Sequence, residues 1–111
     1  MKKTLALAAF GALSQETRLD IFRRLIRATP AAMAAGELAA ELDIPPSTLS
    51  THLAILSRAN LVTAERQGRT ILYAADTEGA KALLTYLIKD CCGGKPELCQ
   101  PLVEAAMPRC C

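Results

Sequence analysis

The sequence contains no tryptophan, only two tyrosines and two phenylalanines, and a single histidine. Aromatic residues make up 4% of the 111 residues, whereas alanine, leucine, glutamate and arginine are frequent, which favours helices over strands. No apolar run reaches the ~20 residues that a helix needs to cross a bilayer. At roughly 100–200 residues per domain, the length allows one core. These absences leave a transmembrane protein without support and exclude a large enzyme with several sites.

Groups that perform catalysis are also scarce. The chain has no second histidine, no carboxylate dyad, no Cys-x-x-Cys motif and no glycine-rich phosphate loop. Because an active site requires several such groups that converge, we expect that the protein is not an enzyme. Hydrophobic residues account for 51% of the chain, which is enough to build a core and excludes a disordered tail.

The first thirteen residues allow two interpretations. Met1-Lys2-Lys3 followed by the apolar run Leu5–Leu13 resembles a secretory signal. The apolar residues nevertheless recur at helical spacing, at Leu5, Ala8, Ala9 and Ala12. No convincing small-residue cleavage site follows, and the stretch continues directly into another helical pattern. We therefore expect residues 4–13 to form the first helix of a cytoplasmic protein.

The helical pattern continues as a second helix. Ser14 offers an N-cap at its start, and Thr29-Pro30 ends it. Its predicted buried stripe consists of Leu19, Phe22, Leu25 and Ile26. Arginines lie largely on the other faces of this helix. With the lysines near the start of the chain, they give residues 1–28 six basic residues against two acidic ones.

The next segment has the pattern of a helix-turn-helix. Glu37–Leu42 forms a short helix, and Pro45-Pro46 marks the start of a longer one that runs to Ala59, because proline is tolerated in a first helical turn. The core face of this longer helix consists of Leu49, Leu53 and Leu56. The opposite face consists of Ser47, Thr51, Ala54 and Arg58.

A hairpin and a last helix complete the predicted fold. Two short β-forming runs, Leu61–Arg66 and Arg69–Ala74, flank Gln67-Gly68, a two-residue turn with a basic tip. The last helix has an apolar stripe and ends at Gly93-Gly94; the stripe is Ala80, Leu83, Leu84, Leu87, Ile88 and Cys91. The fold class is therefore mostly α with a small β-hairpin, a winged helix-turn-helix of four helices, two strands and a fifth helix. Residues 1–92 form the DNA-binding and dimerisation domain, and residues 93–111 form a cysteine-containing tail.

This arrangement suits double-stranded DNA, because the major groove admits one α-helix whose small polar side chains can reach base edges. Arginines on a projecting hairpin suit phosphate or minor-groove contacts. His52, on the flank of the buried face, is expected to face the core or a phosphate and is a poor metal ligand, since no thiol or carboxylate cluster accompanies it. The candidate DNA-binding residues are Ser47, Thr48, Ser50, Thr51, His52, Arg58, Arg66 and Arg69.

All five cysteines lie in the last 21 residues, which argues against a disulfide framework that spans the fold. Cys91 and Cys92 converge best where a helix ends, and Pro96 can return Cys99 to them as a third ligand. Three soft thiolates suit a thiophilic ion. A disulfide switch and inert tail thiols are the alternatives. Cys110 and Cys111 provide a further ligand, a second site or neither.

In this order the segments resemble the ArsR/SmtB family of winged-helix metalloregulatory repressors. The resemblance covers residues 8–90 and rests on Ala12–Ile21, Glu37-Leu38-Ala39, Ser47–Leu56, Ala59–Val62, Gln67-Gly68-Arg69 and Tyr73. It implies a homodimer, formed through the first and last helices, that occupies a palindromic operator. It also implies repression of a resistance operon and release from DNA when a metal or metalloid binds.

The resemblance also bears on the inducer. Many arsenite-sensing members carry a cysteine box where this chain has Ala34–Ala39, without a thiol. Other members have vicinal cysteines after the last helix, which Cys91, Cys92 and Cys99 resemble. Zinc sensors use histidine in the last helix, which this chain lacks. The resemblance therefore implies As(III) or Sb(III) as inducer and no organic cofactor, with cadmium, lead, zinc or a trivalent organoarsenical as alternatives. A thiol switch would use the same cysteines, and a small arsenic-carrying chaperone would not need the hairpin.

Overall fold

The computed structural model describes residues 1–89, 100–101 and 104–105. In chain order, its helices and strands are α1 (Lys3–Leu13), α2 (Glu16–Ala28), β1 (Met33–Ala34), α3 (Ala35–Leu42), α4 (Pro46–Arg58), β2 (Val62–Gln67), β3 (Thr70–Ala75) and α5 (Thr77–Ile88). The predicted fold class, mostly helical with a small antiparallel sheet, is confirmed. In the described part of the chain, no helix has both the length and the apolar character needed to span a membrane.

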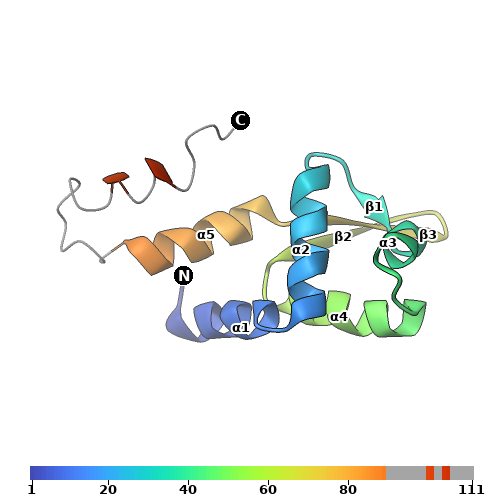
Figure 1. Cartoon of the computed structure of the whole chain (residues 1–111), viewed down its shortest axis with the longest axis horizontal. Helices are drawn as coiled ribbons and strands as arrows, with labels where there is room; N and C mark the ends of the chain where they lie inside the picture. Colours follow the sequence, from blue (N-terminus) through green and yellow to red (C-terminus); the bar gives the residue numbers. More distant parts are fainter. Residues whose placement is uncertain (90–99, 102–103, 106–111) are drawn as a thin grey trace.

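Helix α4 lies along one side of the molecule, and α2 rises from it toward the opposite side (Figure 1). The predicted core face of α4 is confirmed, since Leu49, Leu53 and Leu56 are each at most 1% exposed. These leucines share one core with Ile21 and Leu25 of α2. Helix α4 also contacts α1, α3 and β2, so it lies at the centre of the packing.

The predicted N-cap of α2 is wrong, and its predicted buried stripe is confirmed only in part, since Leu25 is buried and Phe22 packs against the core. Its N-cap is Gln15, whose side chain accepts a hydrogen bond from the Arg18 amide, while the Ser14 hydroxyl bonds back to the preceding helix. In the predicted stripe, Leu19 and Ile26 are 41% and 39% exposed, and the fully buried residues are Ile21 and Leu25. At 100° per residue the apolar residues of this helix cover about 160° of its circumference. The face that packs against the core is narrower than this apolar arc, so only the edge of the arc with Ile21 and Leu25 is fully buried.

The sheet has the order β1-β3-β2, and its first strand is an addition to the predicted hairpin. This strand pairs only Met33 with Tyr73 and Ala34 with Leu72. The hairpin turn is also shifted by one residue, because Gln67 pairs with Thr70 and leaves Gly68-Arg69 as the loop. Gly68 has φ 64°, and in this register glycine takes the first loop position, where a type II′ turn requires a positive φ. The predicted register would instead have placed Gln67 there.

The first turn of α5 lies directly against the connection between α4 and β2. The Asp76 amide donates to the Leu61 carbonyl at 2.9 Å, and the Asp76 side chain caps the helix by accepting from the Gly79 amide at 2.9 Å. A Cβ at Gly79 would overlap the backbone carbonyl of Asn60. Glycine at position 79 therefore allows the end of α4 and the start of α5 to meet. The predicted end of this helix at Gly93-Gly94 lies outside the described residues.

Replacing Gly79 by alanine is expected to destabilise the fold, because the new Cβ meets backbone that moves only with the end of α4. Overpacking of this kind costs about 1–3 kcal/mol. For a domain of this size, each kcal/mol lowers the melting temperature by roughly 4–8 °C. Gly36→Ala is the matched control, since a Cβ there meets open space. Thermal unfolding followed by circular dichroism checks both variants, and equal melting temperatures would contradict the close contact.

Candidate nucleic-acid interface

Helices α3 and α4 form a helix-turn-helix in which the start of α4 reaches the surface. Asp43 ends α3 in the left-handed conformation, with φ 54°, and the Ile44 amide donates to the Ala39 carbonyl at 3.0 Å. Pro45 then occupies the N-cap position and Pro46 begins α4, so Pro45-Pro46 marks the start of this helix as the sequence predicts. Because the leucine face holds the helix to the core, its other face is left to solvent.

The small polar side chains predicted to read DNA lie on this free face. All four are exposed in the first half of α4, as Ser47, Thr48, Ser50 and Thr51. The Thr51 hydroxyl donates to the Ser47 carbonyl at 3.2 Å, so its oxygen remains available as an acceptor. This surface therefore offers hydroxyl groups of the kind that bond to base edges or phosphates.

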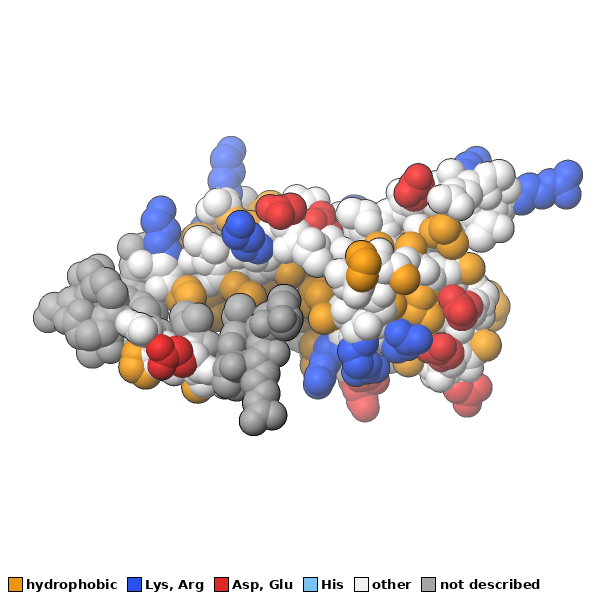
Figure 2. Space-filling model, turned by 90° about the horizontal axis from the view of Figure 1, so that it is seen from above, with side chains coloured by type: hydrophobic (Ala, Val, Ile, Leu, Met, Phe, Trp, Pro, Cys, Tyr) orange, Lys and Arg blue, Asp and Glu red, His pale blue; other side chains and the backbone are white. Residues whose placement is uncertain are grey.

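The hairpin of β2 and β3 lies at the same end of the molecule as the start of α4 (Figure 1). Arg66 and Arg69 are both exposed on it, and basic side chains project into solvent at this end (Figure 2). An open groove of about 460 Å³ joins the two elements, lined by Ser50 of α4 and by Arg69, Thr70 and Tyr73 of the hairpin. The structure thus brings hydroxyl groups and arginines together along one surface.

Two predicted residues lie apart from this surface. Arg58 is exposed in the last turn of α4, about 16 Å along the helix axis from Ser47. His52 is half-buried, and its Nδ1 lies 3.3 Å from a terminal guanidinium nitrogen of Arg18. Of the two roles expected for this histidine, the geometry favours the one directed into the protein.

Arg18 has no role of its own in the sequence predictions beyond its place among the arginines of α2 and in the segment Ala12–Ile21. Its Nε donates to the Ala12 carbonyl at 2.7 Å, and its guanidinium reaches His52 across 34 positions of sequence. No local pattern marks this contact, because the partner belongs to another helix. Arg18 is accordingly half-buried, and its guanidinium is directed toward partners within the protein.

Arg24 is likewise paired within the protein. Its guanidinium bonds to both carboxylate oxygens of Glu41 on α3, at 2.6 and 3.2 Å. This contact holds the pKa of Glu41 below its usual range and raises the pKa of Arg24. An exposed pair of this kind adds little to stability. The Glu41 carboxylate nevertheless offsets one of the positive charges that α2 carries.

The predicted thiol site lies outside the described residues, since Cys91, Cys92, Cys99, Cys110 and Cys111 all belong to the undescribed part of the chain. Within the described ranges, no group of three or more histidine, cysteine, aspartate or glutamate side chains is arranged to hold a metal ion.

Comparison with known proteins identifies relatives of this fold. A family model described as a helix-turn-helix domain matches residues 13–65. The transcriptional activator HlyU of Vibrio cholerae is 32% identical over 82 residues, which cover 74% of this chain and 73% of HlyU. The nodulation protein NolR of Rhizobium meliloti is 31% identical over 83 residues, which cover 75% of this chain and 66% of NolR.

Solved structures agree with these sequence matches. The structure of HlyU from Vibrio cholerae has a TM-score of 0.64 and 31% identity, and the match covers 80% of this chain and 96% of that one. An ArsR-like transcriptional regulator from Rhodococcus sp. RHA1 has a TM-score of 0.70 and 25% identity, with 94% and 93% covered. The homodimeric winged helix-turn-helix DNA-binding domain of a Mycobacterium bovis protein shares the fold, with a TM-score of 0.64, 22% identity, and 87% and 84% covered.

If the hairpin arginines contact phosphates, Arg66→Ala and Arg69→Ala are each expected to weaken DNA binding similarly on all sequences. Each loss should reduce the slope of log affinity against log salt by about one. Arg27→Ala is the control, because Arg27 is exposed in the last turn of α2, at the end of that helix away from α4 (Figure 1). Anisotropy titrations of labelled duplexes at several salt concentrations measure the slopes. An unchanged slope in both hairpin variants would exclude these phosphate contacts.

Proposed function

The chain belongs to the ArsR family of winged-helix transcriptional regulators, and from this premise we propose that it is a repressor of an arsenic resistance operon that responds to arsenite or antimonite. In this proposal, the reduced protein occupies operator DNA in the cytoplasm through α4 and the hairpin. As(III) or Sb(III) then binds cysteine thiolates and releases the protein from DNA.

The observation that carries the proposal is the position of the thiols in the chain. Cys91 and Cys92 lie two and three residues after Lys89, the C-cap of α5, and Cys99 lies seven residues after Cys92. Soft thiolates select thiophilic ions, and their protons leave when such an ion binds. Because α5 carries no histidine, its residues do not supply the imidazole ligands that zinc favours.

The first turn of α5, the helix that precedes these cysteines in the chain, contacts the segment that follows α4. Asp76 and Gly79 hold the first turn of α5 against the Asn60-Leu61 connection, which directly follows α4. A change in the path of the chain after α5 would therefore act on a helix that has no free space at its contact with Asn60, two residues after the end of α4. This connection supports an inducer site after α5.

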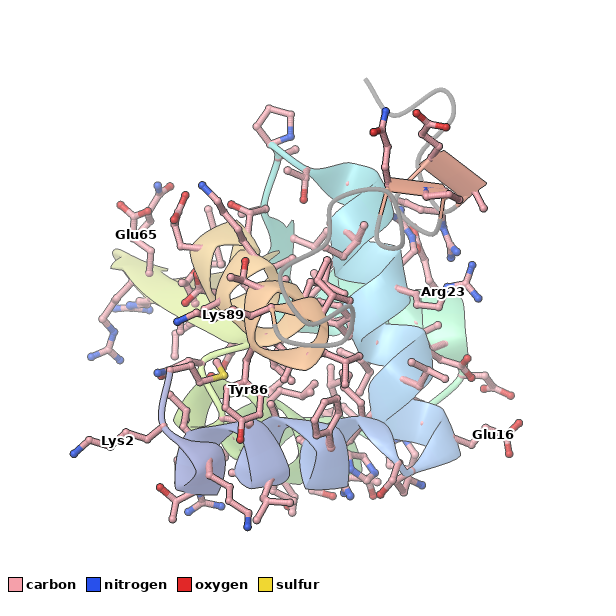
Figure 3. The ribbon with its side chains drawn as sticks, turned by 90° about the vertical axis from the view of Figure 1, so that its left-hand side faces the viewer. Lys2, Glu16, Arg23, Glu65, Tyr86 and Lys89 are labelled. Carbon is pink, nitrogen blue, oxygen red and sulfur yellow. The ribbon has the colours of Figure 1, made fainter. Side chains whose placement is uncertain are left out.

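The proposed repressor is a homodimer formed through α1 and α5. On α5, Leu84 and Leu87 are 56% and 55% exposed although Leu83 is buried, and on α1 Leu7 and Phe10 are exposed. Figure 3 shows the two helices adjacent, with Tyr86 directed from α5 toward α1. Apolar side chains exposed on neighbouring helices are typical of an interface. A two-fold dimer would present two α4 helices about 34–36 Å apart, one turn of DNA.

A second candidate function uses the same cysteines without arsenic. Five cysteines in the last 21 residues also suit a thiol redox switch, or a repressor that responds to cadmium, lead or zinc. Release from DNA by diamide with reversal by a reductant would indicate the redox switch. Release by cadmium, lead or zinc at lower concentration than arsenite would indicate the other metals.

Arsenite is expected to release the reduced wild-type protein from its own upstream promoter DNA at near-stoichiometric concentration, while zinc leaves the complex intact. Cys91→Ser, Cys92→Ser and Cys99→Ser should each keep DNA affinity and lose release, because each removes one of three thiolate ligands. The Cys110→Ser/Cys111→Ser double variant serves as the comparison and should still release. Fluorescence anisotropy measures all five proteins, and unchanged release in the three single variants would place the inducer site elsewhere.

Leu84→Glu and Leu87→Glu are expected to convert the dimer into folded monomers, because both side chains lie outside the core of one chain. Operator affinity should fall at least tenfold, since a monomer contacts one half-site. Ile71→Glu is the control for oligomeric state, because Ile71 is an exposed apolar residue of β3, away from both helices. Analytical ultracentrifugation distinguishes the species, and dimers that persist in both α5 variants would place the interface on another surface.

A further inference from the structure

Arg18 occupies the point where α1, α2 and α4 meet. Its main-chain amide donates to the Gln15 side chain at 2.8 Å, which fixes the first turn of α2. Its Nε donates to the Ala12 carbonyl near the end of α1 at 2.7 Å. Its Nη1 lies 3.3 Å from His52 Nδ1 on α4. One half-buried side chain therefore connects three helices.

The contact with His52 has a defined chemical direction. A guanidinium group only donates hydrogen bonds, so His52 Nδ1 must accept and the ring proton must lie on Nε2. The contact with Ala12 is also favourable, because the last carbonyls of a helix lack partners within it and attract positive charge. Both bonds use the planar, forked donors of arginine, which lysine cannot reproduce with its single ammonium group.

The bond to His52 constrains the rotation of α4 about its own axis, which apolar packing fixes less sharply. Hydrophobic burial of Leu49, Leu53 and Leu56 is non-directional and holds α4 in the core without fixing its rotation sharply. Side chains extend about 5–6 Å from a helix axis, so a displacement of the His52 ring by 1 Å corresponds to a rotation of α4 by about 10°. A directional bond on this flank therefore sets which hydroxyl groups face outward.

We propose that Arg18 is a positioning residue for DNA binding, which fixes the reading helix α4 relative to α1. Because α1 carries part of the proposed dimer interface, this link sets the distance and angle between the two reading helices of the dimer. The inference rests on the proposed homodimeric repressor, and it concerns the spacing of operator half-sites rather than the choice of inducer.

The experiment measures affinity for half-sites at different separations. Duplexes that the wild-type protein selects from a random pool are rebuilt with the half-sites moved by one or two base pairs in either direction. Each base pair changes the separation by about 3.4 Å. Wild-type protein should show a sharp optimum, at least tenfold above its neighbours. If the wild-type protein shows no dependence on spacing, the dimeric repressor itself is wrong, independently of Arg18.

Arg18→Ala should lose at least tenfold in affinity at the preferred spacing and retain less than a threefold difference between spacings. Arg18→Lys should behave in the same way, because lysine presents all its donors from one nitrogen, whereas the contacts with Ala12 and His52 use two different nitrogens of a rigid planar group. Arg23→Ala is the matched control, since Arg23 is exposed on the same helix and points away from α5 (Figure 3). Its spacing optimum should match that of the wild-type protein.

Variants of His52, the residue that Arg18 contacts on α4, provide a second set of measurements. His52→Leu should flatten the spacing profile as Arg18→Ala does, while His52→Asn keeps an acceptor near the Nδ1 position and should restore the optimum. The Arg18→Ala/His52→Leu double variant should be no worse than either single variant, because both remove the same link. If Arg18→Ala fails to fold, the two His52 variants decide the question by themselves.

Two results would overturn the proposal. If Arg18→Ala weakens binding by the same factor at every spacing and reduces the salt slope by about one, Arg18 is a phosphate contact instead. A spacing optimum that is unchanged in Arg18→Ala and His52→Leu would show that packing alone positions α4.

Discussion

The burial of one narrow leucine face on α4 is the constraint on which the rest of the structure depends. Leu49, Leu53 and Leu56 recur at i, i+4 and i+7 and are almost completely buried. Each contributes roughly 1.5–3 kcal/mol of hydrophobic stabilisation, and α1, α2, α3 and β2 all pack around this helix. Because the stripe is narrow, the opposite face has no packing role and can carry hydroxyl groups. The same three residues thus hold the helix in place and leave its other side available to DNA.

Directional contacts on α4 accompany its non-directional apolar packing. Two sets of polar or close backbone contacts hold this helix, each from a helix that also presents exposed apolar side chains. On one side, His52 meets Arg18, which bonds to the end of α1. On the other side, the connection after α4 meets Asp76 and Gly79 of the first turn of α5. The helix proposed to read DNA is therefore positioned by the two helices proposed to form the dimer.

What the sequence predicted well are features determined by neighbouring residues. The period of the leucines in α4, the start of that helix at Pro45-Pro46, and a hairpin around Gly68 all follow from local rules, and all are confirmed. Strand β1 was missed because two residues carry no pattern and form a strand only by pairing with β3. The exposed edge of α2 was missed because its apolar arc is wider than the packed face. The contact between Arg18 and His52 depends on the fold, and no spacing of residues along the chain predicts it.

The two contacts on α4 also define how a change at α5 would reach the DNA-binding surface. His52 and the end of α4 at Arg58 are about 9 Å apart along the helix axis, and Ser47 lies about 8 Å from His52 in the other direction. If the His52 contact holds while the first turn of α5 shifts, α4 pivots about His52 instead of moving as a whole. A displacement of 1 Å at the end of α4 then moves Ser47 by about 0.8 Å in the opposite direction. Coupling between ligand sites in proteins is typically about 1–3 kcal/mol, and it acts equally in both directions. A pivot of this size at each of two reading helices is enough to disturb hydrogen bonds to base edges, whose geometry tolerates only a few tenths of an ångström.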